Sequence, residues 1–163
     1  MPTTYKAYYR SDIGTIEIVS TEEAIQSLNF VEAEADESTV DGPPILEACL
    51  KQLDEYFKGE RQDFTLPLEP DGTDFQKSVW QQLLTIPFGQ TASYLDIARQ
   101  LGNEKAVRAV GLANGRNPIS LIIPCHRVIG SDGTLIGYGG GLWRKAWLLK
   151  HEGALNGGQM ALF

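Results

Sequence analysis

A change of hydrophobic pattern near residue 70 most restricts how this chain can fold. Before it, apolar and polar residues alternate in runs such as 14–20 (GTIEIVS), which is the period of half-buried strands. After it, apolar residues recur every three or four positions, as in 75–86, which is the period of amphipathic helices. The intervening segment, 65–73 (TLPLEPDGT), carries two prolines and a glycine. The pattern therefore predicts two small domains, 1–71 and 72–163.

The first domain is predicted to be a small α/β unit. Three alternating runs, 4–10, 14–20 and 24–34, are joined by short connections and favour a strand meander. A helix is expected over 45–58. Cys49 lies on its apolar face, where a single cysteine is more often core filling than a reactive group.

The second domain is predicted to be mostly helical. After the helix at 75–86 come two short helices, 94–102 and 103–117, separated by a turn that contains Gly102. This arrangement is the helix-turn-helix pattern, here winged-helix-like, and it also occurs in helical hairpins that never bind DNA. Small residues fill the second helix, including Ala106, Gly111 and Ala113, so that its backbone could approach a partner closely, or pack tightly against its own core.

The net charge of −7 at first argues against a nucleic-acid partner, because DNA-binding surfaces are usually basic. The charge is unevenly divided, however. Residues 1–71 hold 5 Lys and Arg against 16 Asp and Glu, a net charge of −11, whereas residues 72–163 hold 9 against 5, a net charge of +4. The acidity therefore belongs to the first domain, and the second is free to meet phosphates.

The cysteines and histidines are too few and too scattered for a structural zinc site, so no metal and no cofactor are expected. No disulfide is expected between Cys49 and Cys125 in a cytoplasmic chain. No apolar run approaches the roughly 20 residues that span a bilayer, and no secretory signal is recognisable, so the expected location is the cytoplasm, without membrane contact.

The segment LIIPCHRVIG carries the strongest chemical signal. Cys125 follows an apolar run and Pro124, with His126 and Arg127 directly after it. A thiol becomes nucleophilic only as a thiolate, which requires a nearby base or positive charge. Neighbouring side chains in an extended backbone point in opposite directions, so contact between Cys125 and His126 would need a turn or a bridging water. A buried structural cysteine beside a core histidine is the alternative.

Three successive segments of this chain resemble the active-site region of the O6-alkylguanine-DNA alkyltransferases. They are RAVGLANGRNP, PCHRVIG and GYGGGLWRKAWLLKHEGA, in this order. The resemblance is dense from Tyr94 to Ala154 and keeps the family's order and spacing. It implies a repair protein that moves an alkyl group from O6-alkylguanine in double-stranded DNA, and in addition from O4-alkylthymine, onto its own cysteine in a single turnover.

The resemblance also implies roles for individual catalytic residues. Cys125 matches the alkyl acceptor, and His126 matches the histidine that takes the thiol proton through a water. Glu152 matches the carboxylate that orients this imidazole. Asn117 matches the asparagine that braces the turn around the site. Tyr94 matches the tyrosine that helps to rotate the nucleotide and protonates the leaving guanine.

Further matches concern DNA and base binding. Arg108 matches the finger that enters the base stack when the target nucleotide is flipped out, while the small residues of the same helix, Ala106, Gly111 and Ala113, allow close approach to DNA. The guanine pocket is expected to be formed by Tyr138, Gly139 and Val128. At Gly139 several relatives carry serine, so this pocket is expected to be roomier.

Two other functions and one additional partner follow from the sequence. A cysteine hydrolase would use the same cysteine, histidine and glutamate but would turn over repeatedly, and a pure DNA-binding module would not transfer alkyl groups.

The protein is expected to be a monomer. Its last residues, QMALF, are similar to the peptide by which repair proteins bind the replication sliding clamp, with Gln159, Leu162 and Phe163 as the contacts; folding back of this tail onto the protein is the alternative.

Overall fold

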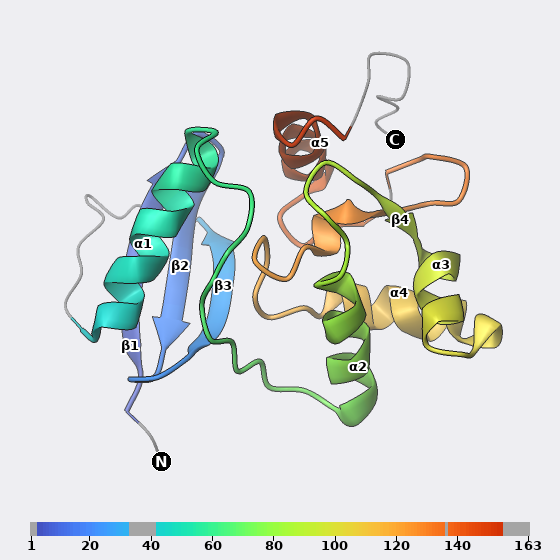
Figure 1. Ribbon diagram of the computed structural model, residues 1–163, viewed down its shortest axis with the longest axis horizontal. Coiled ribbons are helices and arrows are strands. Elements are labelled where there is room, and N and C mark those ends of the chain that lie inside the picture. The colour runs from blue at the N-terminus through green and yellow to red at the C-terminus, as the bar shows by residue number, and fades with distance from the viewer. Residues whose placement is uncertain (1–2, 33–41, 136, 155–163) are drawn as a thin grey trace. The chain divides into compact units, whose positions relative to one another are not determined.

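The computed structural model describes residues 3–32, 42–135 and 137–154. The chain divides into two compact units, Met1–Asp71 and Gly72–Phe163. The first is a small sheet with one helix and the second is mostly helical (Figure 1), which confirms the predicted fold class. No helix in the described part of the chain is long and apolar enough to cross a membrane.

The N-terminal unit is an antiparallel meander covered by a helix (Figure 1). Strand β1 (Tyr5–Ser11) pairs with β2 (Gly14–Ser20), which pairs with β3 (Ile25–Val31). Helix α1 (Pro44–Phe57) buries the apolar face that its periodicity predicted, including Cys49, which is fully buried. Burial raises the pKa of the Cys49 thiol to about 12, so this cysteine is a core residue and a poor nucleophile.

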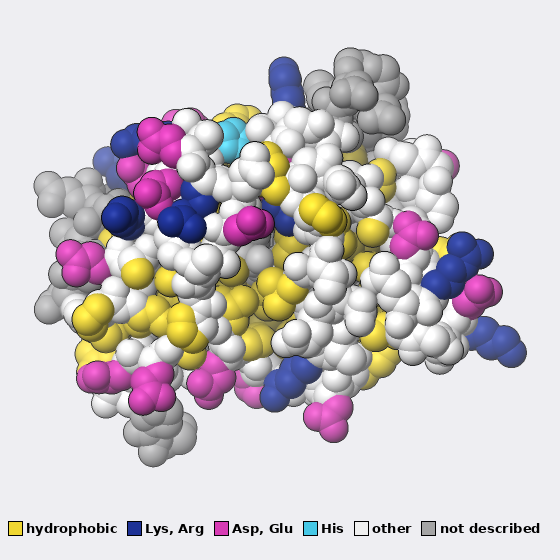
Figure 2. All heavy atoms as spheres, viewed as in Figure 1, with side chains coloured by type: hydrophobic (Ala, Val, Ile, Leu, Met, Phe, Trp, Pro, Cys, Tyr) yellow, Lys and Arg dark blue, Asp and Glu magenta, His cyan; other side chains and the backbone are white. Residues whose placement is uncertain are grey.

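Among the charged side chains of this unit acidic ones outnumber basic ones, and both kinds lie on the face drawn in Figure 2. Lys58 pairs with Asp54 at 2.8 Å, and Arg61 pairs with Glu55 at 2.9 Å. These pairs neutralise only a small part of the unit's negative charge, so a contact with DNA phosphates is not favoured here.

The C-terminal unit contains short helices and one short strand pair. Its elements, in chain order, are α2 (Asp74–Leu83), β4 (Ala92–Ser93), α3 (Tyr94–Gln100), η1 (Glu104–Ala106), α4 (Val107–Gly115), η2 (Cys125–Arg127), β5 (Val128–Ile129) and α5 (Leu142–His151). Helices α3 and α4 are joined through a turn in which Gly102 has a φ of +79°, a conformation that favours glycine. The predicted helix-turn-helix is therefore present.

The core of this unit holds α4 in place from one side. Val110 and Ala113 of α4 are buried, and the Ala113 carbonyl accepts a 2.9 Å hydrogen bond from the indole nitrogen of Trp80 on α2. Because Trp80 is itself 2% exposed, this bond fixes α4 to the core and leaves the opposite face of the helix to the surface.

The segment between the predicted helices 75–86 and 94–102 shows no strand pattern in the sequence, yet it contributes one strand of the short strand pair. Ala92 pairs with Val128 and Ser93 with Ile129, in parallel. Two-residue strands are too short to show a period, which is why the sequence did not reveal them. The pairing brings the start of α3 next to the turn that carries Cys125, because α3 begins directly after β4 and this turn ends directly before β5.

Candidate active site

The turn that leads to Cys125 is held by Asn117. Its side-chain amide donates to the Ile123 carbonyl at 2.8 Å, and its carbonyl oxygen accepts from the Ile119 amide at 3.0 Å. Within this turn, Leu121 has a φ of +73°, a left-handed conformation that costs a side chain of this type about 1–2 kcal/mol. A buried asparagine bonded to both arms of the turn offsets such a cost and fixes the backbone before the cysteine.

Cys125 begins the 3₁₀ turn η2 and is 5% exposed. Because the backbone turns here, the extended conformation considered in the sequence analysis does not apply. Burial raises the pKa of the thiol, while the Asn117 side chain and the charge of Lys145 act in the opposite direction. The net shift is upward, so Cys125 is held as a thiol and needs a base to become a thiolate.

A buried network of three charged or polar side chains adjoins the cysteine. His126 Nε2 lies 2.8 Å from Glu152 Oε2. Arg127 binds the same carboxylate with two hydrogen bonds, from Nε at 2.8 Å and from Nη2 at 3.0 Å. A third bond runs from Arg127 Nη1 to the Ile86 carbonyl at 2.7 Å, and the guanidinium lies over the Phe88 ring. The side chains of His126 and Glu152 are both fully buried.

The network determines which nitrogen of His126 can accept a proton. Burial opposes ionisation of Glu152, but its hydrogen bonds with His126 and Arg127 outweigh this and hold its pKa well below the usual range. An ionised carboxylate only accepts hydrogen bonds, so Nε2 must carry the hydrogen. The Nδ1 atom of His126 then has a lone pair, and it is buried without a hydrogen-bond partner among the described residues. Burial also lowers the pKa of His126, so the imidazole is neutral and ready to accept.

A cavity of about 410 Å³ lies in the same unit, and Cys125, His126 and Glu152 are not among the residues that line it. It is lined by both helices of the helix-turn-helix and by the loop before α5, namely by Tyr94, Val107, Arg108, Gly111, Leu112, Asn114, Gly115, Gly137 and Tyr138. Burial raises the pKa of Tyr94 and of Tyr138, and a negative charge on Cys125 raises both further. Both phenols therefore remain protonated, and a thiolate at Cys125 would favour their protonated form further.

Four of the predicted site residues line this cavity, namely Tyr94, Arg108, Gly111 and Tyr138. Gly139 is exposed and is not among the lining residues, so the prediction that it widens the guanine pocket stays a prediction. Ala106 ends η1 and is half-buried.

One prediction requires correction and another stays a prediction. Ala113 was expected to face DNA, but it is 2% exposed and packs inward beneath Trp80, because it lies on the core side of α4. Val128 was expected in the guanine pocket; it is fully buried in β5 and, like Cys125, is not among the residues that line this cavity, so its place in the pocket stays a prediction. Its main chain pairs with Ala92, directly after the turn that carries Cys125.

Lys145 is a further residue of the site, which was not predicted from the sequence. Lys145 is fully buried on α5, and its Nζ donates to the Gly137 carbonyl at 3.3 Å, in the loop that carries Tyr138. Burial lowers its pKa to about 8, against the opposing effect of Cys125. A signal was available, since Lys145 occupies an apolar position of the stripe formed by Leu142, Ala146 and Leu149.

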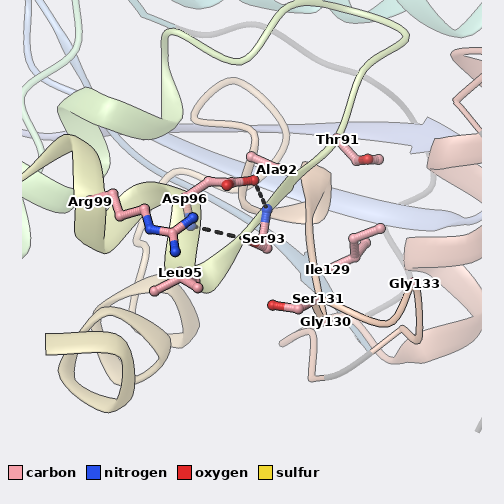
Figure 3. A pocket seen from close by; sticks show the side chains of 10 residues that line it. All are labelled: Thr91, Ala92, Ser93, Leu95, Asp96, Arg99, Ile129, Gly130, Ser131 and Gly133. Carbon is pink, nitrogen blue, oxygen red and sulfur yellow. Dashed lines mark hydrogen bonds between the residues drawn. The ribbon is translucent and has the colours of Figure 1, made fainter. Parts of the chain in front are cut away.

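A second cavity of about 400 Å³ lies between the start of α3 and the turn after β5 (Figure 3). Its main polar groups already have partners. Ser93 and Asp96 form a reciprocal capping box, drawn as dashed lines in Figure 3, and Arg99 pairs with Glu104 at 3.1 Å. No group of three His, Cys, Asp or Glu side chains that could hold a metal occurs among the described residues. The chemistry is therefore concentrated around Cys125.

Comparison with known proteins matches both units to domains of one protein family. Residues 74–154 match the model of the 6-O-methylguanine DNA methyltransferase DNA-binding domain, and residues 4–70 match the model of the ribonuclease-like domain of the same protein. A relative from Methanosarcina acetivorans, named methylated-DNA–protein-cysteine methyltransferase, is 47% identical over 92% of this chain and 99% of its own length. One from Mycobacterium leprae with the same name is 49% identical over 87% of this chain and 88% of its own.

Solved structures agree. The O6-methylguanine methyltransferase of Mycobacterium tuberculosis is 43% identical, covers 93% of this chain and 94% of its own, and superposes with a TM-score of 0.83. The OGT protein of the same organism in complex with DNA is 45% identical, covers 90% of this chain and 92% of its own, and has a TM-score of 0.81. Both domain models and these relatives confirm the resemblance drawn from the sequence, and the chain belongs to the 6-O-methylguanine DNA methyltransferase family.

Proposed function

We propose that this protein repairs DNA by transferring an alkyl group from O6-alkylguanine to Cys125 in a single turnover. The observation that carries the proposal is the fully buried His126–Glu152 pair beside a buried thiol that needs a base. The relatives named above are methylated-DNA–protein-cysteine methyltransferases, and one similar structure holds DNA.

The chemistry begins with the thiol proton, which passes to Nδ1 of His126 through a bridging water. Glu152 stabilises the imidazolium that forms. The Cys125 sulfur then attacks the alkyl carbon, the bond between this carbon and O6 breaks, and its electron pair goes to the guanine. Tyr94 donates its phenolic proton to the departing base and regains one from His126. The products are a thioether and guanine, and no step restores the thiol, so each molecule reacts once.

The target oxygen is hidden in the duplex, so the nucleotide must leave the stack and enter the cavity lined by Tyr94 and Tyr138. Arg108 is exposed on α4 at the edge of this cavity, where it can fill the vacated space. We propose that the protein acts as a monomer in the cytoplasm.

Replacement of Arg108 with alanine is expected to slow repair of duplex DNA on the order of 100-fold, at roughly 1.4 kcal/mol per factor of ten. The reason is that the arginine would no longer stack and hydrogen-bond in the vacated space. Reaction with free O6-benzylguanine should fall far less, because no stacked base has to be held out. Single-turnover rates on both substrates measure the difference. Equal slowing would instead show that Arg108 supports the cavity.

Intact-mass spectrometry tests the proposed function. After incubation with duplex DNA carrying O6-methylguanine, the protein should gain the mass of one methyl group in place of one hydrogen, and peptide mapping should place it on Cys125. A parallel duplex with O4-methylthymine tests the second substrate. A cysteine hydrolase would show no stable adduct and a pure binding module would show no mass change, so either result would overturn the proposal.

We also propose that the tail recruits the replication sliding clamp through Gln159, Leu162 and Phe163. These residues lie outside the described residues, and the support is the sequence QMALF alone. The isolated tail peptide should bind the clamp, and protein lacking 159–163 should lose clamp binding while keeping alkyl transfer. Absence of binding by the peptide, with unchanged behaviour of the truncated protein, would remove this proposal and leave the repair function intact.

A further inference from the structure

The surface face of α4 carries more than the arginine finger. The exposed positions fall on one side of the helix and its C-cap, at intervals of three and four residues: Arg108, Ala109, Leu112, Gly115 and Arg116. Positions four apart are neighbours on a helix surface, so Arg108, Leu112 and Arg116 form one row, with the small residues beside it. An apolar side chain thus stands between two cations.

Leu112 is the most exposed of the large apolar side chains in the described chain, at 64%. It is not needed by the core, because the buried side of α4 is formed by Val110, Ala113 and Asn114. Yet Leu112 lines the same cavity as Arg108, Tyr94 and Tyr138. Its exposure is therefore located at the mouth of the candidate active site.

We propose that Leu112 is a second, apolar wedge, which enters the minor groove beside Arg108 and contacts the base pair next to the extruded nucleotide. This inference rests on the proposed function. Leucine is one of the side chains that proteins insert between base steps from the minor groove, where they unstack and bend the duplex. Arg116, four residues further along the same row, supplies a cation that the flanking phosphates attract.

The spacing shows that Leu112 and Arg108 would not compete for one position. Four residues of helix rise about 6 Å, whereas consecutive bases of one strand lie about 3.4 Å apart. With Arg108 in the vacated space, Leu112 therefore lies more than one base step along the helix from it and meets a neighbouring base pair rather than the same gap. Ala109 and Gly115 on the same face add no bulk that would hold the helix away from the groove.

Alanine at position 112 tests the wedge, because it keeps the helix and removes only the exposed side chain. Alkyl transfer would be timed on an O6-methylguanine duplex, on the same strand without its complement, and on free O6-benzylguanine. For Leu112→Ala, the ratio of the duplex rate to the free-base rate should fall roughly tenfold. The single strand should be affected much less, because it offers no neighbouring base pair.

The matched control is Leu84→Ala, which also removes an exposed leucine of the same unit, 42% exposed at the end of α2 and outside the cavity lining. Its rates should equal those of the unaltered protein on all three substrates. An unchanged duplex rate for Leu112→Ala, or equal slowing on all three substrates, would overturn the wedge. Transfer by the unaltered protein would in that case still uphold the proposed function. Absence of transfer by the unaltered protein would overturn both.

Discussion

Serine in place of Cys125 is expected to abolish alkyl transfer completely while DNA binding stays near normal. The thiol is already hard to ionise, since burial raises its pKa, and a hydroxyl is far harder to ionise than a thiol. The exchange of sulfur for oxygen changes little in volume, so the turn held by Asn117 should persist. Methyl transfer from a labelled O6-methylguanine duplex measures the loss, and duplex affinity in a binding titration shows that the fold is intact.

Cys49→Ala is the control for this substitution, because Cys49 is the other cysteine of the chain and is buried in α1 of the N-terminal unit. It should keep full transfer, with some loss of stability from the cavity that it creates. Residual methyl transfer by the Cys125→Ser protein, or loss of transfer by Cys49→Ala, would show that Cys125 is not the acceptor.

Glu152→Gln is expected to lower the unfolding free energy of the C-terminal unit by about 3–5 kcal/mol, the cost of breaking a buried ion pair from one side. The amide leaves the Arg127 guanidinium, 8% exposed, without a compensating charge, and its NH2 group replaces one of the two oxygens that accept from Arg127 and His126. Transfer should fall as well, because the imidazolium loses its carboxylate. Denaturant unfolding followed by tryptophan fluorescence reports on this unit alone, since all three tryptophans lie in residues 72–163.

The pH dependence of unfolding gives an independent readout. The folded-state pKa of Glu152 is depressed, so its contribution is fully present above the unfolded-state pKa of about 4.3 and is lost as the pH falls through the folded value. Glu152→Gln should therefore flatten the acid side of the stability profile. The control Glu104→Gln breaks an exposed pair with Arg99 and should cost only about 0–1 kcal/mol. A loss for Glu152→Gln no larger than this would contradict the buried-pair argument.

Periodicity alone predicted most of the secondary structure. The three strands and the helices α1, α2, α3 and α4 lie close to their predicted bounds, because each buries one apolar face and therefore shows it in the sequence. The change of pattern near residue 70 predicted the change from sheet to helices for the same reason. The charge contrast between residues 1–71 and 72–163 likewise needed no coordinates.

The candidate site was only partly accessible from the sequence. Cys125 and His126 are adjacent in the chain, but a pair of neighbours carries little information by itself, and it was the family resemblance that linked them to Glu152, 26 positions after His126. The structure brings His126 and Glu152 within hydrogen-bonding distance and adds Arg127, which binds the same carboxylate twice. Such long-range partners leave no local period and cannot be derived from spacing.

The direction in which each side chain points was decided by tertiary packing. Ala113 and Leu112 are neighbours on one helix, and composition alone suggested that the small residue would face a partner. In the structure Ala113 is buried under Trp80, and Leu112 is exposed at the cavity. Lys145 is buried beside the loop that carries Tyr138. The sequence by itself determined which elements form and which family they resemble, whereas only the tertiary structure decided which groups share a low-dielectric interior, because burial and proximity depend on contacts far apart in the chain.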